Sequence, residues 1–494
     1  ILAQDEGGRL IGGQNGRPPP AGRTAMEGPE AALRPCSGEE EEESSSGSSD
    51  SSSDEPCCQC SGFVAAVSNF SIQYNYACAS VATAVMASHN DHTGPKVHAD
   101  FREPDWAKEF LLSLVFIGSV FGMLTMGYLG DVIGIRRALI VTNLNAVLGA
   151  LISVASWGGA ESVWRTIAVG RFLLGFGVGG NYPLSAAKAS ESTPSVAEAS
   201  KKAADAFFWQ GPGSCAPYVL GLLLLLLPSS EYRTSLQFRI LLGVGALPSA
   251  VVLWAAVREP EVARPQQRYD RLRQALSQPR HWRALVGTAG TWLLFDVAFY
   301  GNVIFVPVIL SRVFGKGKSL SAMAWHAAFL SFLGILGTMG GVSAVNHIGP
   351  KKLNNVGLTI GAFLFGAFAL VYRFLSYPRM LFALLCLINF TMYFSANIAT
   401  YLLPVVSFPS DVRSTFHGLS AAAAKVGAML GALLFPIIEL HFGTAAVMST
   451  QAVVCLAGAL LCHFCVENRG LQDAEEDAGD CAEEDAVELQ KIKA

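Results

Sequence analysis

The sequence predicts an all-α membrane protein in which twelve transmembrane helices form two six-helix bundles. Of its 494 residues, 51% are hydrophobic and only 15% are charged, whereas soluble domains carry about 25% charged residues. Apolar segments long enough to cross a bilayer recur from about residue 62 onward, separated by short polar breaks. Only helices that satisfy their own backbone hydrogen bonds explain so many apolar segments, so the composition excludes an ordinary soluble enzyme.

The predicted spans fall into two groups of six, separated by a longer polar stretch. That stretch, residues 258–284, contains seven Arg together with several Gln and Pro. We interpret it as a basic linker between an N-terminal bundle (61–257) and a C-terminal bundle (285–466). The predicted spans are 62–87, 109–130, 138–157, 165–186, 206–227, 238–257, 285–310, 325–346, 354–374, 380–404, 414–438 and 443–466.

Charge separates a basic body from two acidic tails. Residues 1–55 carry 12 acidic and 4 basic side chains, residues 467–494 carry 10 and 3, and the residues between them carry 17 and 28. The formal net charge of −4 therefore masks a body with a net charge of +11. The run EEEEESSSGSSDSSSDE within the first tail is too polar to bury a core, so residues 1–60 are predicted to be disordered. The binding partners of both tails are unknown.

Basic residues also orient the predicted helices. Loops rich in Lys and Arg stay on the cytoplasmic side of a membrane, so we expect the central linker there. Because the number of spans is even, both termini are expected in the cytoplasm too, and we expect the plasma membrane rather than an organelle. Cys57, Cys58 and Cys60 cluster just before the first span, where lipidation and unmodified thiols are equally compatible with the pattern.

The loop after the second predicted span reads Gly127-Tyr-Leu-Gly-Asp131-Val-Ile-Gly134-Ile-Arg136-Arg137. Glycines here permit tight turns and close helix approach, and an aspartate accepts hydrogen bonds from neighbouring helix ends. The loop resembles the signature of the major facilitator superfamily. The resemblance implies a cytoplasmic gate in which Asp131 and the two arginines act as a latch.

A degraded copy of the same turn follows the eighth predicted span. It reads Asn346-His-Ile-Gly349-Pro-Lys-Lys and occupies the equivalent place in the second half of the chain. Such a copy is typical of transporters that arose by internal duplication.

Ionisable residues inside two predicted spans indicate a polar site. Trp292, Asp296 and Tyr300 recur every four residues in the seventh span, so they share one helix face. Lys425 lies among small residues in the eleventh span. Charged groups inside a membrane are costly and usually face a partner or a cavity. A static Asp296–Lys425 ion pair is one interpretation; we favour a binding site, because aromatic donors flank the acid.

Five segments together resemble the phosphate:proton symporter family, as in the high-affinity phosphate transporters of fungi and plants. They are Gly170-Arg-Phe-Leu-Leu-Gly-Phe-Gly-Val-Gly-Gly-Asn181-Tyr182-Pro-Leu-Ser, Gln210-Gly211, Gly287-Thr-Ala-Gly-Thr-Trp292-Leu-Leu-Phe-Asp296-Val-Ala-Phe-Tyr300-Gly301, Asn397 through Pro404, and Arg413-Ser-Thr-Phe-His-Gly418-Leu-Ser-Ala-Ala-Ala-Ala-Lys425-Val-Gly427. The resemblance covers about 62–466 and implies alternating-access transport of inorganic phosphate at a site between the bundles. It implies phosphate contacts from Tyr182, Gln210, Trp292, Asp296, Tyr300 and Asn397, with Lys425 nearby.

Four positions depart from the family pattern: Ala66 aligns with the first acid of a pair in the family's first helix, Met123 stands where the family has a Gln in the second helix, and two further acids are replaced by amides. Asn181 stands where the family has an Asp directly before the fourth-helix Tyr, and Asn69 aligns with an acid of the family's first helix. The resemblance implies that these acids carry the coupled proton, but an amide does not titrate. Three interpretations stay open: a phosphate carrier without ordinary proton coupling, coupling through Asp296 alone, or a shift to another anion such as an organophosphate.

Other function classes are also considered. One alternative is a carrier of an organic ion or sugar from the same superfamily. Another is a phosphate sensor or scaffold that does not transport. The sequence shows no nucleophile–base set and no metal cluster, so we expect no enzyme activity, no metal and no cofactor. Expected partners are inorganic phosphate, with or without protons, and the lipid bilayer, but no nucleic acid.

Overall fold

The computed structural model describes residues 58–467 except for 92–103, 105, 192, 194, 227–232, 261–267, 315–319 and 376. The predictions about both tails and about Cys57 fall outside these residues, whereas Cys58 and Cys60 belong to the first turn of α1. Every regular element in the described ranges is a helix.

Twelve segments of membrane-spanning length make up this part of the chain, nine of them single helices and three broken once. A further short helix, α9 (Arg268–Ser277), lies between the sixth and seventh segments. In order, the segments are α1 (Cys58–Asp91), α2 (Ala107–Val132), α3 (Ile135–Val154), α4 (Ala160–Ala189), α5 (Val196–Phe208) with α6 (Gln210–Leu225), α7 (Arg233–Val244) with α8 (Ala246–Arg258), α10 (Pro279–Phe314), α11 (Leu320–Ile348), α12 (Pro350–Phe374), α13 (Pro378–Phe394) with α14 (Ala396–Ser407), α15 (Arg413–Phe442) and α16 (Thr444–Cys465).

Prolines explain two of the three breaks. Proline has no N–H to donate and displaces the carbonyl four residues before it. Pro212 therefore leaves the carbonyl of Phe208 at the end of α5 without its helical donor. Pro248 does the same to Val244 at the end of α7. The fifth and sixth segments are thus bent by their sequence.

Each predicted span falls on one of these segments, and the fifth differs most. Its helix begins at Val196 rather than near residue 206, because the Ser195 hydroxyl accepts a hydrogen bond from the Glu198 amide at 3.1 Å and caps it. The added turns contain Glu198, Lys201, Lys202 and Asp205. Hydropathy locates only the apolar part of a helix, so it does not reveal a polar extension of this kind.

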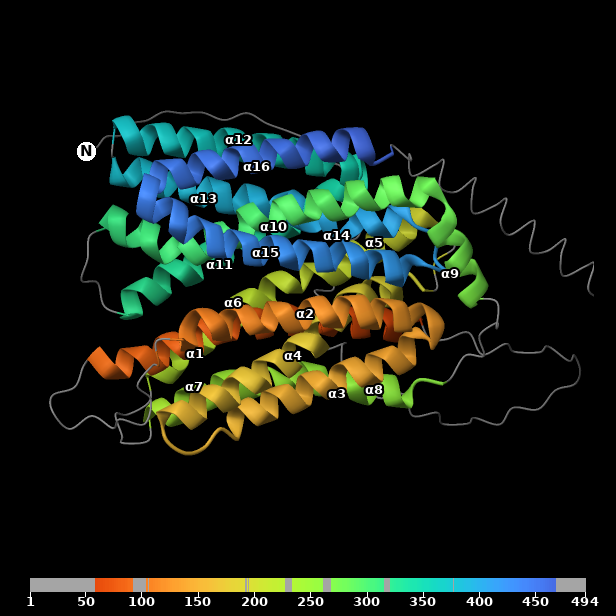
Figure 1. Ribbon diagram of the computed structural model, residues 1–494, viewed down its shortest axis with the longest axis horizontal. Coiled ribbons are helices and arrows are strands. Elements are labelled where there is room, and N and C mark those ends of the chain that lie inside the picture. The colour runs from red at the N-terminus through yellow and green to blue at the C-terminus, as the bar shows by residue number, and fades with distance from the viewer. Residues whose placement is uncertain are drawn as a thin grey trace, which may run out of the picture. The chain divides into compact units, whose positions relative to one another are not determined.

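The helices of each half of the chain pack mainly among themselves. In Figure 1 α1 to α4, α7 and α8 lie together below α10 to α16, whereas α5 lies beside α14. Contacts agree: α4 packs against α2 and α3, α10 against α15, and α12 against α16. The halves meet where α2 packs on α15 and where α5 and α6 pack on α11. The first interface joins the second and eleventh segments, and the second joins the fifth and eighth. Each pair becomes the other when the two halves of the chain are exchanged, which supports the internal duplication.

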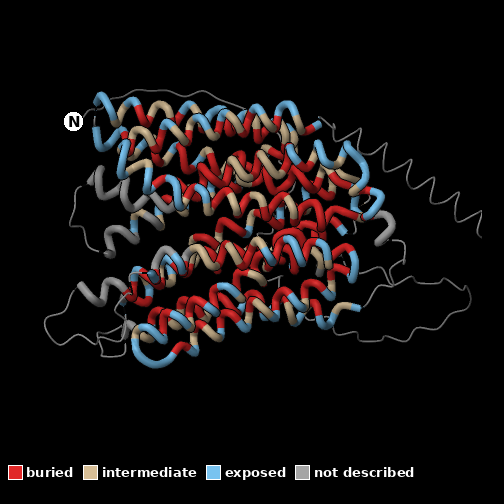
Figure 2. Tube along the Cα trace, in the orientation of Figure 1, coloured by how far each residue is buried: buried red, intermediate tan, exposed pale blue. Residues whose placement is uncertain are grey.

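The body has apolar side chains outside and polar side chains inside. Figure 2 shows buried residues where helices meet and exposed residues along the outer helices. Exposed apolar side chains include Leu148 on α3, Phe363 on α12 and Val453 on α16, whereas Asp296 and Lys425 are buried. Nine segments within the described ranges are long and apolar enough to cross a membrane; the more polar α1, α4 and α5–α6 are not among them. This arrangement suits lipid as the surrounding solvent and confirms the predicted all-α membrane fold.

Candidate functional site

A buried ion pair forms the centre of the predicted site. Lys425 on α15 donates from Nζ to Oδ2 of Asp296 on α10 at 3.0 Å, and both side chains are 2% exposed. The same ammonium donates to the Tyr300 hydroxyl at 3.0 Å. We call Asp296, Tyr300 and Lys425 the charged core. It joins three of the residues that the sequence motifs predicted.

Small residues allow α10 and α15 to approach closely enough for this pairing. A Cβ at Gly427 would collide with the backbone of Leu293, and one at Gly431 would collide with the backbone of Val297. Helices in membranes approach closely where small residues line their interface. The small residues around Lys425 therefore bring its α15 backbone within reach of Asp296.

Aromatic rings from the first bundle cover the Lys425 ammonium. The Lys425 nitrogen lies 5.2 Å from the ring centroids of Tyr76 on α1 and of Tyr182 on α4, and 4.3 Å from that of Tyr300. Ring faces attract cations, most strongly where water is excluded. Since Tyr76 and Tyr182 belong to one bundle and Lys425 to the other, the charged core faces the boundary between the bundles.

Trp292 lies within a second group of rings beside the charged core. Its ring centroid is 6.1 Å from that of Tyr182, 6.3 Å from that of Tyr401 and 5.5 Å from that of His417. His417 is buried, and its Nε2 lies 3.1 Å from the backbone oxygen of Tyr401. A carbonyl oxygen only accepts hydrogen bonds, so this nitrogen carries the proton.

Three amide side chains extend from this site into the first bundle. Gln210 on α6 donates from Nε2 to Oδ1 of Asn69 on α1 at 2.7 Å. Gln73, one turn after Asn69, donates from Nε2 to Oε1 of Gln210 at 2.9 Å. Asn69 in turn donates from Nδ2 to the Ala65 oxygen at 2.9 Å and to Ser185 Oγ at 3.4 Å. We call Gln73, Gln210 and Asn69 the amide chain.

The structure places Asn181 apart from this amide chain. Asn181 and Asn143 on α3 exchange two amide hydrogen bonds, at 3.0 and 3.1 Å, and both residues are fully buried. The next residue, Tyr182, belongs to the aromatic cover of Lys425. Asn181 thus forms a neutral pair within the first bundle.

Within the described residues, Asn397 is not joined to the other predicted contacts by a side-chain hydrogen bond. It is half-buried near the start of α14, and its backbone oxygen lies 3.5 Å from the Thr400 hydroxyl. The predicted contacts also omit several residues of the site: Gln73 and Tyr76, and three that lie within the quoted segments, Ser185, Tyr401 and His417. Gln73 was detectable, because the i, i+4 spacing from Asn69 puts both amides on one helix face.

The loop motif after the second predicted span joins the two bundles through a contact that we call the latch. Asp131 Oδ2 at the end of α2 accepts hydrogen bonds from the Thr415 amide and the Thr415 hydroxyl, both at 2.7 Å. Thr415 lies in the first turn of α15, where free N–H groups and the helix dipole favour a carboxylate. Gly127 is required here, since a Cβ would lie 2.8 Å from the Ser414 oxygen. Gly134 has a φ of +102° before α3, a conformation that favours glycine.

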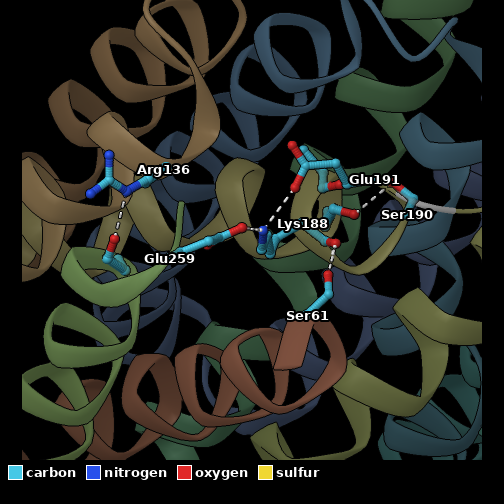
Figure 3. A network of polar contacts seen from close by, with 9 residues as sticks. Ser61, Arg136, Lys188, Ser190, Glu191 and Glu259 are labelled. Atoms are coloured by element: carbon cyan, nitrogen blue, oxygen red, sulfur yellow. Dashed lines mark hydrogen bonds and ion pairs between the residues drawn. The ribbon is translucent and has the colours of Figure 1, made fainter. Parts of the chain in front are cut away.

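The arginines of the motif lie at the same end of the first bundle, which we call the linker end because residues 259–284 follow there. Arg136 donates to the backbone oxygens of Ala256 and Val257 at the end of α8, both at 2.9 Å (Figure 3). These bonds satisfy carbonyls that a helix end leaves without partners. Arg137 is exposed at the start of α3.

A buried lysine ties α4 to the end of α8 at the linker end. Lys188 Nζ pairs with Glu191 Oε2 at 2.8 Å and with Glu259 Oε1, while Ser61 Oγ donates to the Lys188 oxygen at 2.6 Å (Figure 3). The neighbouring Ser190 accepts a hydrogen bond from Arg413 of α15 at 2.9 Å. The latch and this network together close the linker end between α2, α4 and α15.

The degraded second copy of the motif lies beside the start of α5. Asn346 lines a surface pocket with Ser195, Glu198 and Lys201. It precedes Gly349 by three residues, as Asp131 precedes Gly134. Gly349 repeats the positive φ, at +76°. The second copy thus keeps its place and turn but replaces the carboxylate with an amide, and Ser195 caps the facing helix instead.

Comparison with known proteins decides the family. The model of the Major Facilitator Superfamily matches residues 64–432. This chain belongs to the major facilitator superfamily. The family expected from the sequence motifs is thereby confirmed, and the fold agrees with it. The proton:xylose symporter XylE superposes with a TM-score of 0.69 at 15% identity, over 85% of this chain and 98% of that one. FucP in an outward conformation superposes with a TM-score of 0.61.

Curated relatives of this superfamily member are named as inorganic phosphate transporters. "Inorganic phosphate transporter PT2" of Toxoplasma gondii is 33% identical over 414 residues, which is 82% of this chain and 71% of that protein. "Probable inorganic phosphate transporter 1-6" of Arabidopsis thaliana is 28% identical, over 79% of this chain and 86% of that protein. "Inorganic phosphate transporter 1-6" of Oryza sativa is 29% identical, over 65% and 72%.

Proposed function

We propose that this protein carries inorganic phosphate across a membrane by alternating access of its two bundles. The relatives' names supply the substrate. The observation that carries the proposal is a buried ammonium, Lys425, at the bundle boundary beside phenol, indole and amide groups. Phosphate oxygens accept hydrogen bonds from such donors. No enzyme activity is part of this proposal.

The charged core explains how the site remains stable when it is empty. Unpaired buried charges are strongly unfavourable, so Asp296 neutralises Lys425 until an anion arrives. An entering phosphate then shares the ammonium and accepts from Tyr300, while Asp296 accepts the hydrogen bond of a protonated phosphate oxygen. Tyr182, Gln210, Trp292 and Asn397 complete the proposed contacts from both bundles.

The amides at the altered positions make the hydrogen bonds that protonated acids would make. Asn69 donates to the Ala65 oxygen and accepts from Gln210. An ionised carboxylate cannot donate, so only a protonated acid would replace Asn69 there. Asn181 likewise both donates to Asn143 and accepts from it. We therefore propose a carrier without proton transfer at these positions. Because Asp296 is held as the counter-ion of Lys425, we further propose that it carries no coupled proton, which is the first of the three interpretations above.

Transport requires the latch to open. In this structure Asp131 joins α2 to the first turn of α15, so the linker end is closed between these helices. Opening exchanges those buried hydrogen bonds for water. We propose that the linker end and both termini face the cytoplasm, and that the membrane is the plasma membrane.

Flux measured with purified protein in proteoliposomes tests the proposal. Radiolabelled phosphate should exchange across the membrane with the protein and not with empty vesicles. Unlabelled phosphate should compete, and sulfate, which has no proton to share with Asp296 near neutral pH, should compete poorly. Flux of an organophosphate in place of phosphate would identify another substrate. Phosphate binding without flux would identify a sensor and contradict the proposed transport.

A further inference from the structure

An aromatic ring of the first bundle stands in for a hydrogen-bond partner at Lys425. An ammonium has three N–H donors, and two of those of Lys425 reach Asp296 Oδ2 and the Tyr300 hydroxyl, each at 3.0 Å. Within the part of the chain that the structure describes, no acceptor meets the third N–H. Instead, the ammonium lies over the ring of Tyr76 on α1, 5.2 Å from its centroid. A ring face attracts a cation most strongly where water is excluded, and Tyr76 is buried.

The Tyr76 hydroxyl is held by α2, so Tyr76 offers Lys425 only its ring. The hydroxyl donates to Ser119 Oγ at 2.8 Å. Ser119 donates its own proton to the Val115 oxygen at 2.6 Å, so it accepts from Tyr76 and the phenol proton is used there. The ring of Tyr182 is also 5.2 Å from the ammonium, but Tyr182 is already a proposed phosphate contact. Tyr76 differs from it, because its hydroxyl has no proton left to donate to an anion.

Phosphate and the Tyr76 ring compete for the same N–H. The face of an aromatic ring carries partial negative charge, so it attracts the ammonium and repels an anion. A phosphate that binds the third N–H of Lys425 therefore turns this N–H away from the ring. Hydrogen bonds between two ionised groups are among the strongest in proteins, so an anion replaces the ring rather than the reverse.

We propose that the Tyr76 ring is a placeholder for phosphate, which covers the third N–H of Lys425 in the empty carrier and yields it to the anion. The proposal rests on the phosphate transport proposed above. Tyr76 belongs to α1 and Lys425 to α15, so this contact joins the two bundles while the site is empty. A carrier that takes up phosphate without exchange must close and return empty. The ring keeps the buried ammonium covered during that return.

Fluorinated phenylalanines at position 76 test the placeholder through the affinity for phosphate. Fluorine withdraws electrons from the ring face and weakens its attraction for a cation, with little change in shape. Equilibrium binding of radiolabelled phosphate to the purified full-length protein is compared for Tyr76→Phe and for its mono-, di- and trifluorinated forms. We expect binding to tighten along the series, by about three- to tenfold in total. The matched control is the same series at Tyr74 of α1, whose hydroxyl donates to the Leu241 oxygen at 2.9 Å; phosphate affinity there should not change along the series.

Transport kinetics give a second readout, which a purely structural role of Tyr76 would not produce. In proteoliposomes, net uptake into vesicles without internal phosphate requires the empty carrier to return, whereas exchange against internal phosphate does not. Tyr76→Leu removes the ring and leaves the third N–H of Lys425 uncovered, so net uptake should fall about three- to tenfold relative to exchange. Tyr76→Phe retains the ring and should keep the ratio of net uptake to exchange of the original protein.

Each outcome decides the proposal. Phosphate affinity that stays constant or weakens along the fluorinated series at position 76 would overturn the placeholder, and so would an equal loss of net uptake and exchange in Tyr76→Leu. If Tyr76→Leu does not fold, the fluorinated series decides alone, because its members keep the ring. If the unsubstituted protein binds no phosphate, the proposed function fails, and the series is measured with sulfate and with glycerol phosphate. An affinity for whichever anion binds that does not depend on fluorination would overturn the role of Tyr76, as would the absence of binding by all three anions.

Discussion

The Asp296–Lys425 pair gives a sharp prediction about stability. Both side chains are 2% exposed and their atoms lie 3.0 Å apart, so removal of one partner leaves the other charge buried and unpaired. Such removal costs about 3–5 kcal/mol, whereas replacement of both partners is about neutral. We expect Lys425→Met and Asp296→Leu each to destabilise the protein by about 3–5 kcal/mol. The double variant should recover most of this loss.

Denaturant unfolding of the purified protein, followed by tryptophan fluorescence, measures these changes. Phosphate binding is measured on the same samples. The double variant should be stable yet bind no phosphate, because the ammonium is gone. Glu161→Gln is the control, since its ion pair with Arg165 is exposed and contributes at most about 1 kcal/mol. Additive destabilisation in the double variant would refute the pairing argument, and normal binding would show that the pair is only structural.

Two further predictions concern the linker end. Asp131→Ala removes the acceptor of two hydrogen bonds at 2.7 Å and should shift the protein toward opening of the linker end by about 1.5–3 kcal/mol. A cysteine introduced at Ser414 should then react faster with a thiol label. An unchanged labelling rate would contradict the latch. Gly134→Ala should lower stability by about 1–2 kcal/mol, since φ there is +102°. The matched change Gly366→Ala, in an open helical site, should instead be neutral or stabilising, and equal thermal shifts in both variants would argue against this explanation.

The sequence alone located the membrane helices, because a run of apolar residues is a local signal. Apolar runs of fixed length located all twelve segments, and the Gly134 turn identified the boundary between α2 and α3. The polar start of α5 was missed, since Ser195 and the charged residues after it look like a loop. The spacing of four residues predicted that Trp292, Asp296 and Tyr300 share one face of α10, and Asp296 and Tyr300 both accept hydrogen bonds from Lys425.

Contacts between distant segments were harder to predict. The partner of Asn181 is Asn143, on another helix, and no spacing in the sequence reports that pairing. His417 was not assigned to the site, because its ring neighbours, Trp292 and Tyr401, come from other helices. Gln73 was missed although it lies one turn after Asn69, because its partner Gln210 comes from another helix, α6.

Proton dependence of phosphate uptake tests the central claim most directly. In proteoliposomes, initial uptake is measured at one external pH, which keeps the ionic forms of phosphate constant, with internal pH either equal or more alkaline. The account predicts the same initial rate under both conditions, because Asn69 and Asn181 do not titrate. Asn69→Asp and Asn181→Asp, singly and together, test whether a restored acid adds proton dependence. A rate in the unsubstituted protein that rises strongly with the proton gradient would contradict the account.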